Sequence, residues 1–240
     1  MTKLRDSSDF YDDFVEHQEA FGVNDRHRAI LRQMQRAGFS PGHRVLEIGC
    51  GVGTLTEVVA RELGPSGAIL AVDLSPRSID AARRRLRGLA RVEFVAADVL
   101  TADLDGRFHM IVLPDVIEHI PLEHHRTLFG RIASWLEPGG CIVLNYPNPH
   151  YLAWCHEHRP DLVQIVDQPI HADVLLQNVY PHGLYLDYLE TYSIWIEEGD
   201  YVAVVLRPTS ATGTYTTIPD PPRSIFSRVA DRARRLVGNT

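Results

Sequence analysis

A glycine-rich turn between an apolar run and a helical pattern constrains the fold of this chain more than any other feature. Residues 45–54 read Val-Leu-Glu-Ile-Gly-Cys-Gly-Val-Gly-Thr, so three alternating glycines follow an apolar strand. Glycine is needed where the backbone turns with positive φ, or where a ligand approaches the main chain closely. At the end of a strand in an α/β sheet, such a loop is typical of a nucleotide-cofactor site.

Strand and helix patterns alternate along the chain after this turn. Short apolar runs fall at 44–48, 68–72, 92–96, 108–113 and 141–144, and helical spacing of apolar residues covers 55–63, 79–89 and 122–136. Alternating βα units of this length predict a parallel sheet with helices on both faces.

The last part of the chain has a different pattern. Residues 153–180 favour helix interrupted at Pro160 and Pro169, and residues 192–197 and 201–207 predict a β-hairpin around Glu198-Gly199-Asp200. The second strand of that hairpin is apolar on both faces, so we expect it to lie buried within the sheet.

Three domains are predicted from these patterns. Residues 1–39 favour two helices, residues 40–207 form the α/β core, and residues 208–240 combine a Pro/Thr/Ser-rich linker with an amphipathic helix. That helix carries five arginines and Asp231, which makes it basic within a chain of net charge −7.

Composition limits the location and the partners that we expect. A net-acidic chain is a poor general nucleic-acid binder, because phosphate contacts require a basic surface. Three cysteines without a CxxC pair indicate no disulfide framework, and the first ten residues lack the apolar stretch of a secretion signal. No apolar run is long enough to span a bilayer. We therefore expect a soluble, cytoplasmic protein with no stable membrane insertion.

Acidic residues at strand ends narrow the class of cofactor. The dinucleotide fingerprint is G-x-G-x-x-G, whereas residues 49–53 have G-x-G-x-G. Glu47 would repel a pyrophosphate but suits a ligand with an amino group or a sulfonium charge. Asp73 ends the second strand, where it can accept both ribose hydroxyls. Asp98 follows the third strand, where it can accept from an adenine amino group.

Five motifs occur in one order: 47–53, Asp73, Asp98, 113–120 and 136–140. With these five motifs in this order, the chain resembles class I S-adenosylmethionine-dependent methyltransferases. Within that class it is most similar to the ubiquinone-pathway O-methyltransferase branch and its small-molecule and natural-product relatives. The resemblance covers about residues 40–207. It implies a Rossmann-like α/β fold with a seven-stranded sheet in the order 3-2-1-4-5-7-6, strand 7 antiparallel, under an N-terminal helical lid.

The resemblance also implies which residues contact S-adenosylmethionine and its product, S-adenosylhomocysteine. The contacts to the methionine and ribose parts would come from Glu47, Gly49, Cys50, Gly51, Gly53 and Asp73. The adenine would lie against Leu74, Asp98 and Val99. Pro114 and Asp115 end the fourth strand, beside the methionine and the substrate.

Histidines are the candidates for chemistry, because a general base assists transfer to a hydroxyl and histidine titrates near neutral pH. His119 follows the fourth strand and His150 the fifth, and both are candidate catalytic bases. Tyr146, Asn148 and Tyr11 are candidate substrate contacts, Tyr11 from the lid. His124 and His125 are expected to face solvent. The histidine spacing matches no standard metal site, so no metal is expected.

These residues predict methyl transfer to a small polar acceptor, with O-methylation of a sugar, glycoside or natural-product intermediate as the first acceptor class. A quinone or lipid-like phenol, an amine, and a cofactor-binding subunit without catalysis remain as alternatives. The oligomeric state stays open between a monomer and a homodimer.

Overall fold

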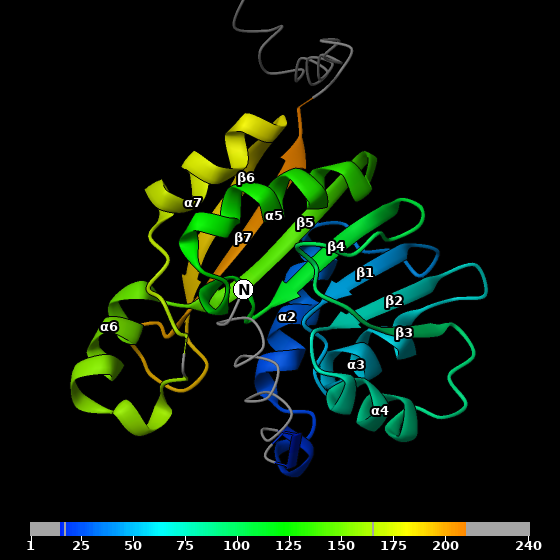
Figure 1. Ribbon diagram of the computed structural model, residues 1–240, viewed down its shortest axis with the longest axis horizontal. Coiled ribbons are helices and arrows are strands. Elements are labelled where there is room, and N and C mark those ends of the chain that lie inside the picture. The colour runs from blue at the N-terminus through cyan, green and yellow to red at the C-terminus, as the bar shows by residue number, and fades with distance from the viewer. Residues whose placement is uncertain (1–14, 17, 165, 210–240) are drawn as a thin grey trace, which may run out of the picture. The chain divides into compact units, whose positions relative to one another are not determined.

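A seven-stranded sheet with helices on both faces organises the protein (Figure 1). The computed structural model describes residues 15–209, except 17 and 165. The strands are β1 Arg44–Ile48, β2 Ala68–Asp73, β3 Val92–Ala96, β4 Phe108–Pro114, β5 Leu136–Pro147, β6 Leu184–Tyr192 and β7 Tyr201–Pro208. The helices are α2 Asp25–Arg36, α3 Thr54–Glu62, α4 Pro76–Arg85, α5 Leu122–Trp135, α6 Pro149–His158 and α7 Ala172–Val179, with short 3₁₀ turns at 117–119, 160–162 and 180–182. Among the described residues, no helix is long and apolar enough to cross a bilayer.

The predicted strand order is confirmed. The sheet runs β3-β2-β1-β4-β5-β7-β6, and β7 is antiparallel to both of its neighbours, β5 and β6. The other neighbouring pairs are parallel. Residues on both faces of β7 are buried, as its two-sided apolar pattern predicts, because Val204 and Leu206 belong to the core on one side of the sheet and Val205 to the core on the other.

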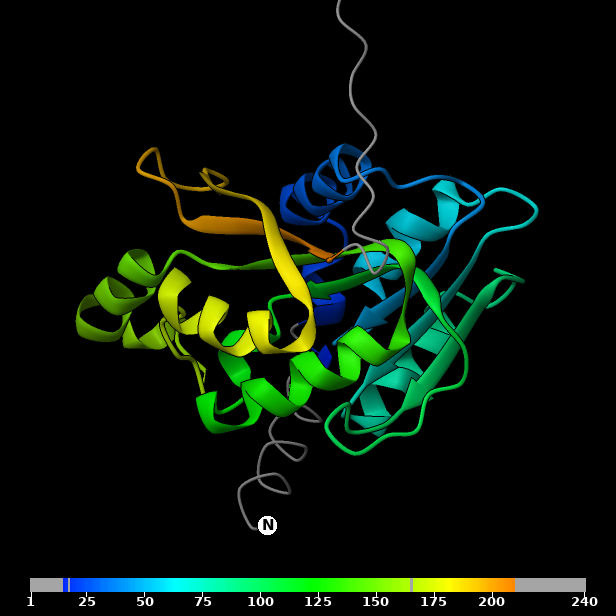
Figure 2. The same ribbon diagram turned by 90° about the horizontal axis from the view of Figure 1, so that it is seen from above.

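Alternate residues of each central strand enter two different cores, because side chains along a strand point to opposite faces. Val45, Ile69 and Met110 pack with α2 and α3 on one face. Leu46, Leu70 and Ile111 pack with α5 and α7 on the other. Figure 2 shows these two helical layers above and below the sheet. Because β1 to β5 are parallel to one another, their carboxyl ends all lie at one edge of the sheet.

The helix α2 belongs to this core and is tied to the far edge of the sheet. Met34 and Ile30 are fully buried. The Gln33 side-chain amide donates to Glu190 on β6 at 2.6 Å and accepts from the Tyr188 hydroxyl at 3.1 Å. The helical lid expected over residues 1–39 stays a prediction, and α2 is the part of that segment that is packed into the core. The linker and helix expected over 208–240 lie, from residue 210 onward, outside the described residues.

The hairpin prediction was wrong in its first strand. The strand β6 ends at Tyr192 instead of covering residues 192–197. The buried Asp200 carboxylate accepts from the backbone N–H groups of Ile194 at 2.7 Å and Trp195 at 3.2 Å. These two backbone N–H groups therefore do not form hydrogen bonds with a neighbouring strand, and the chain forms a loop between β6 and β7.

Two other elements differ from their predicted bounds. The strand β5 is longer than the expected 141–144, because its Pro-Gly-Gly segment forms an irregularity in the pairing with β4 and the strand continues on both sides. The helix expected from residue 153 begins at Pro149. Proline is favourable in the first turn of a helix, and the Asn148 side chain caps that turn by accepting from the His150 N–H at 3.0 Å.

The packing of α2 generates a stability prediction. Replacing Met34 by Ala removes a fully buried side chain and leaves a cavity, so we expect the free energy of unfolding to fall by about 2–5 kcal/mol. Urea denaturation followed by circular dichroism measures it. The matched control on the same helix is Arg28→Ala, whose side chain is 57% exposed and should change stability by less than about 0.5 kcal/mol. Equal effects of the two substitutions would contradict the core assignment of α2.

Candidate functional site

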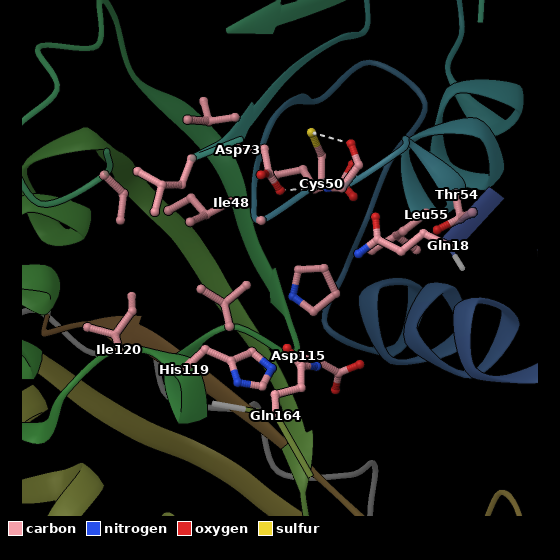
Figure 3. Close-up of a pocket in the computed structure, with 18 of the residues that line it drawn as sticks. Gln18, Ile48, Cys50, Thr54, Leu55, Asp73, Asp115, His119, Ile120 and Gln164 are labelled. Atoms are coloured by element: carbon pink, nitrogen blue, oxygen red, sulfur yellow. Dashed lines mark hydrogen bonds between the residues drawn. The ribbon is translucent and has the colours of Figure 1, made fainter. Parts of the chain in front are cut away.

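A cavity of about 1000 Å³ opens at the carboxyl ends of β1, β2 and β4 and beside the turn that follows β3. Figure 3 draws Cys50 and Asp73 on one side of it and Asp115, His119 and Gln164 on the other. The first side is built by the glycine turn and the ends of β2 and β3. The second side is built by the end of β4, the turn 117–119 and Arg26 of α2.

The glycine turn brings backbone close to the cavity. Gly49, Gly51 and Gly53 all have positive φ, between 51° and 79°. At Gly51 an added Cβ would lie 2.6 Å from Oε1 of Gln18, so this glycine allows a residue from the N-terminal segment to reach the turn. At Gly53 an added Cβ would meet Ala82 of α4 at 3.3 Å and Leu86, the residue that caps the end of α4, at 3.1 Å. Gly53 therefore serves helix packing and does not line the cavity.

The Asp73 carboxylate joins this turn to the next one. Its Oδ2 accepts from the Gly51 N–H at 2.7 Å, and its Oδ1 accepts from the Ser75 N–H at 2.9 Å. Ser75 in turn caps α4, because its hydroxyl oxygen accepts from the Ser78 N–H at 3.0 Å. A carboxylate oxygen can accept more than one hydrogen bond, so a ligand hydroxyl is a suitable additional donor to this side chain. Asp73 thus fixes both turns and lines the cavity between them.

Glu47 is a buried acid under the same turn. Its Oε2 accepts from the Thr56 hydroxyl at 2.7 Å, whereas its Oε1 has no hydrogen-bond partner. Burial raises the pKa of Glu47 to about 8, and the nearby Asp73 charge adds to the shift. A cationic ligand group would favour the ionised form of such an acid.

The end of β3 supplies a mixed polar and apolar wall. Asp98 Oδ1 accepts from the Leu100 N–H at 2.8 Å, which fixes the turn after the strand. Leu74, Val99, Leu100 and Ile120 line the cavity around it. A flat apolar ring with one polar edge would suit this wall.

An ion pair crosses the other side of the cavity. Arg26 of α2 pairs with Asp115 at the end of β4, through one guanidinium nitrogen and Oδ2. Asp115 has a φ of 52°, a left-handed backbone that aspartate tolerates better than most residues. Its N–H donates to the Asn145 carbonyl at 2.8 Å, which anchors the turn to β5. Arg26 Nε and Asp115 Oδ1 are buried and have no hydrogen-bond partner.

His119 lies on the same side, between two acids. Its Nδ1 is 2.6 Å from the Val166 carbonyl, 4.0 Å from Asp167 Oδ1, and its Nε2 is 3.9 Å from Glu118 Oε1. A short contact to a carbonyl requires a proton on Nδ1, which makes Nε2 the basic nitrogen of the neutral ring. Burial lowers the pKa of His119 and outweighs the opposing effect of Asp167. The imidazole is therefore neutral at neutral pH and can accept a proton.

The cavity brings together most of the residues that the sequence singles out. Its lining includes Glu47, Gly49, Cys50, Gly51, Asp73, Leu74, Asp98, Val99, Pro114, Asp115 and His119. Tyr146, Asn148 and His150 do not line it. Tyr146 belongs to β5 and is 1% exposed, Asn148 caps α6 and donates to the Gly199 carbonyl at 2.7 Å, and His150 is exposed on α6. Tyr11 lies outside the described residues.

Sequence reasoning missed several lining residues. Gln18, Arg26, Gln164 and Trp195 come from segments before and after the strand–helix alternation and carry no motif. The expectation that His124 and His125 face solvent was wrong. His124 lines the cavity, and His125 is fully buried, with Nε2 donating to the carbonyls of Ile117 and Ile120 at 2.9 Å each. Across the part of the chain that the structure describes, no group of three or more His, Cys, Asp or Glu side chains is arranged to hold a metal ion.

Comparison with known proteins gives the family of the central segment. Residues 45–140 match the family model described as a methyltransferase domain. The chain is 34% identical over 126 residues to trans-aconitate 2-methyltransferase of Methylobacterium nodulans, covering 52% of this chain and 46% of that protein. It is 35% identical over 111 residues to the ubiquinone biosynthesis O-methyltransferase of Xanthomonas campestris, covering 45% and 44%. The chain thus spans about half the length of the curated relatives it matches.

Solved structures share the fold. The N-methyltransferase NodS of Bradyrhizobium japonicum, in complex with S-adenosylhomocysteine, matches with a TM-score of 0.60 and 22% identity, over 77% of this chain and 86% of NodS. A TehB-like methyltransferase from Corynebacterium glutamicum matches with a TM-score of 0.61 and 16% identity, over 85% of this chain and 100% of its own. At these identities the likeness establishes the architecture.

The buried acids generate a prediction on pH. Burial raises the pKa of Glu118 to about 8, whereas the pKa of a glutamate in an unfolded chain is about 4.3. The folded protein binds more protons between these values, so this part of its stability is present at low pH and is lost as pH rises through about 8. We expect the free energy of unfolding to decrease from about pH 5 to pH 8, and Glu118→Gln to flatten that decrease. Urea titrations across this range measure it, with the exposed Glu62→Gln as the matched control. An unchanged pH slope in Glu118→Gln would contradict the burial argument.

Proposed function

We propose that this chain, which carries a class I S-adenosylmethionine-dependent methyltransferase domain, transfers a methyl group to a hydroxyl oxygen of a small polar molecule. The observation that carries this proposal is the cavity itself. One side of the cavity, formed by the glycine turn and Asp73, suits the cofactor. On the other side, the neutral imidazole of His119 lies among polar groups.

The residues present fit the cofactor. The Asp73 carboxylate lines the cavity at the end of β2, and carboxylates are suitable acceptors for ribose hydroxyls. Glu47 has an unpartnered oxygen under the glycine turn, where a cationic ligand would favour its ionised form. Asp98 lies within the apolar wall formed by Leu74 and Val99, as an adenine with its amino group would require. When bound, S-adenosylmethionine supplies an electrophilic methyl group on sulfur.

The protein's own contribution is positioning and proton acceptance. Holding the two reactants in one cavity makes transfer effectively unimolecular, which accounts for much of the acceleration in such reactions. His119 is oriented by the Val166 carbonyl, with Nε2 as the basic nitrogen. A hydroxyl placed against Nε2 would give up its proton as its oxygen attacks the methyl group.

The acceptor class follows from the second side of the cavity. Asp115, Arg26, Gln164 and His119 make that side polar, which favours a sugar, a glycoside or a natural-product intermediate over a lipid-like phenol. The names of similar proteins cover both O- and N-methyltransferases, so they leave the methylated atom to experiment.

The cofactor assignment of Asp73 can be tested directly. Asp73→Ala leaves ribose hydroxyls unpaired, so S-adenosylhomocysteine should bind more weakly by about 1–3 kcal/mol. Isothermal titration calorimetry measures this, and Asp73→Asn, which keeps one acceptor oxygen, should lie between Ala and the wild type. The matched control is Asp80→Ala, because the Asp80 side chain is 64% exposed on α4. Wild-type affinity in Asp73→Ala with an unchanged circular dichroism spectrum would refute the assignment.

The base is tested by kinetics. His119→Gln should reduce turnover about 10²–10⁴-fold while S-adenosylhomocysteine still binds, because only proton acceptance is lost. Transfer from labelled S-adenosylmethionine to an acceptor panel measures it, with the exposed His158→Gln as the control. His150→Gln tests the other candidate base that the sequence predicted. A drop in turnover for His150→Gln and none for His119→Gln would show that the base is misassigned.

A further inference from the structure

We propose that the second side of the cavity is a subsite for a saturated ring carrying neighbouring hydroxyl groups, of the pyranose class. Trp195 would cover one face of the ring, and the Arg26–Asp115 pair would bind two of its hydroxyls. This inference rests on the proposed function and narrows its acceptor.

Trp195 is an aromatic side chain held open toward the cavity. It is 60% exposed and lines the cavity, although it belongs to the loop between β6 and β7. Its ring packs edge-on against Tyr201, with centroids 5.7 Å apart and an interplanar angle of 64°. Its backbone is fixed by the buried Asp200 carboxylate. The indole is therefore held in place while most of its surface remains accessible, and an exposed large apolar surface at a cavity marks a binding contact.

The ion pair supplies a donor and an acceptor next to each other. Arg26 Nε can still donate and Asp115 Oδ1 can still accept, and both atoms are buried without a hydrogen-bond partner. Gln164 Oε1 is a third such atom on this side of the cavity. A buried polar atom without a hydrogen-bond partner destabilises the unliganded protein, so a ligand that pairs with these atoms removes that cost.

The chemistry of these atoms selects hydroxyls. A hydroxyl both donates and accepts, so two neighbouring hydroxyls can meet Arg26 Nε, Asp115 Oδ1 and Gln164 Oε1 together. A carboxylate has no proton to donate and would face the two oxygen acceptors of Asp115 and Gln164. A simple phenol offers one hydroxyl and leaves the remaining atoms unpaired.

The aromatic and polar parts of the subsite belong to one cavity. Trp195, Arg26 and Asp115 all line this cavity of about 1000 Å³. Tyr201, on which Trp195 packs, is buried in β7 and supports the indole from behind. The proposed ring would occupy the space between Trp195 and the ion pair.

The experiment uses the full chain loaded with S-adenosylhomocysteine. Saturation-transfer NMR is recorded with the methyl α-pyranosides of glucose, galactose and mannose, and with phenol and propylamine as phenol and amine probes. We expect saturable binding of at least one pyranoside. Trp195→Ala should weaken it by about tenfold, from the loss of the aromatic contact, and Trp195→Phe should retain most of it. Trp154→Ala is the matched control, since Trp154 is 47% exposed on α6 and does not line the cavity.

The outcomes separate this inference from the proposed function. If the wild-type protein does not bind S-adenosylhomocysteine, the proposed function is refuted. Cofactor binding without any pyranoside binding, stronger binding of phenol or propylamine, or pyranoside binding unchanged in Trp195→Ala would refute the subsite alone. S-adenosylhomocysteine affinity in Trp195→Ala should equal that of the wild type, because Trp195 acts on the acceptor.

Discussion

The Asp73 carboxylate is the contact on which the cavity depends. One of its oxygens holds the glycine turn after β1 through the Gly51 N–H, and the other holds the turn after β2 through the Ser75 N–H. Without it, backbone N–H groups at the ends of two neighbouring strands would lose their acceptor. The same carboxylate faces the cavity, so one side chain both shapes the site and can bind ligand.

Buried acids give the site its electrostatic character. Glu47 and Glu118 are both almost completely buried and have oxygens without partners, and their pKa values are raised to about 8. Burial disfavours the charged form of an acid and, for His119, the charged form of a base. The two effects favour an uncharged imidazole at His119 beside the buried, uncharged carboxyl group of Glu118.

The two sides of the cavity have different structural origins. The side that we propose for the cofactor is built from turns that directly follow β1, β2 and β3, so the strand order fixes its position. The other side is assembled from α2, the end of β4 and the loop between β6 and β7. Those parts can change in sequence while the sheet stays the same, which is how one fold serves different acceptors.

The sequence by itself determined most of the strands and the positions of the glycine turn and Asp73, and the family resemblance of its motifs implied the strand order. Two-residue and 3.6-residue periodicity are local signals, and a glycine turn after a strand together with an acid at the next strand end places Asp73 without knowledge of packing. The sequence failed where a residue's surroundings are set by contacts distant in the chain. Arg26 meets Asp115 across 89 positions, and the buried Asp200 turns residues 193–197 out of the expected strand to present Trp195. The sequence predicted Tyr146 as a substrate contact, but β5 pairs with β7 at this position and the Tyr146 side chain is buried in the core. Tertiary structure decided these positions, because burial and hydrogen-bond partners depend on which segments meet and not on their local pattern.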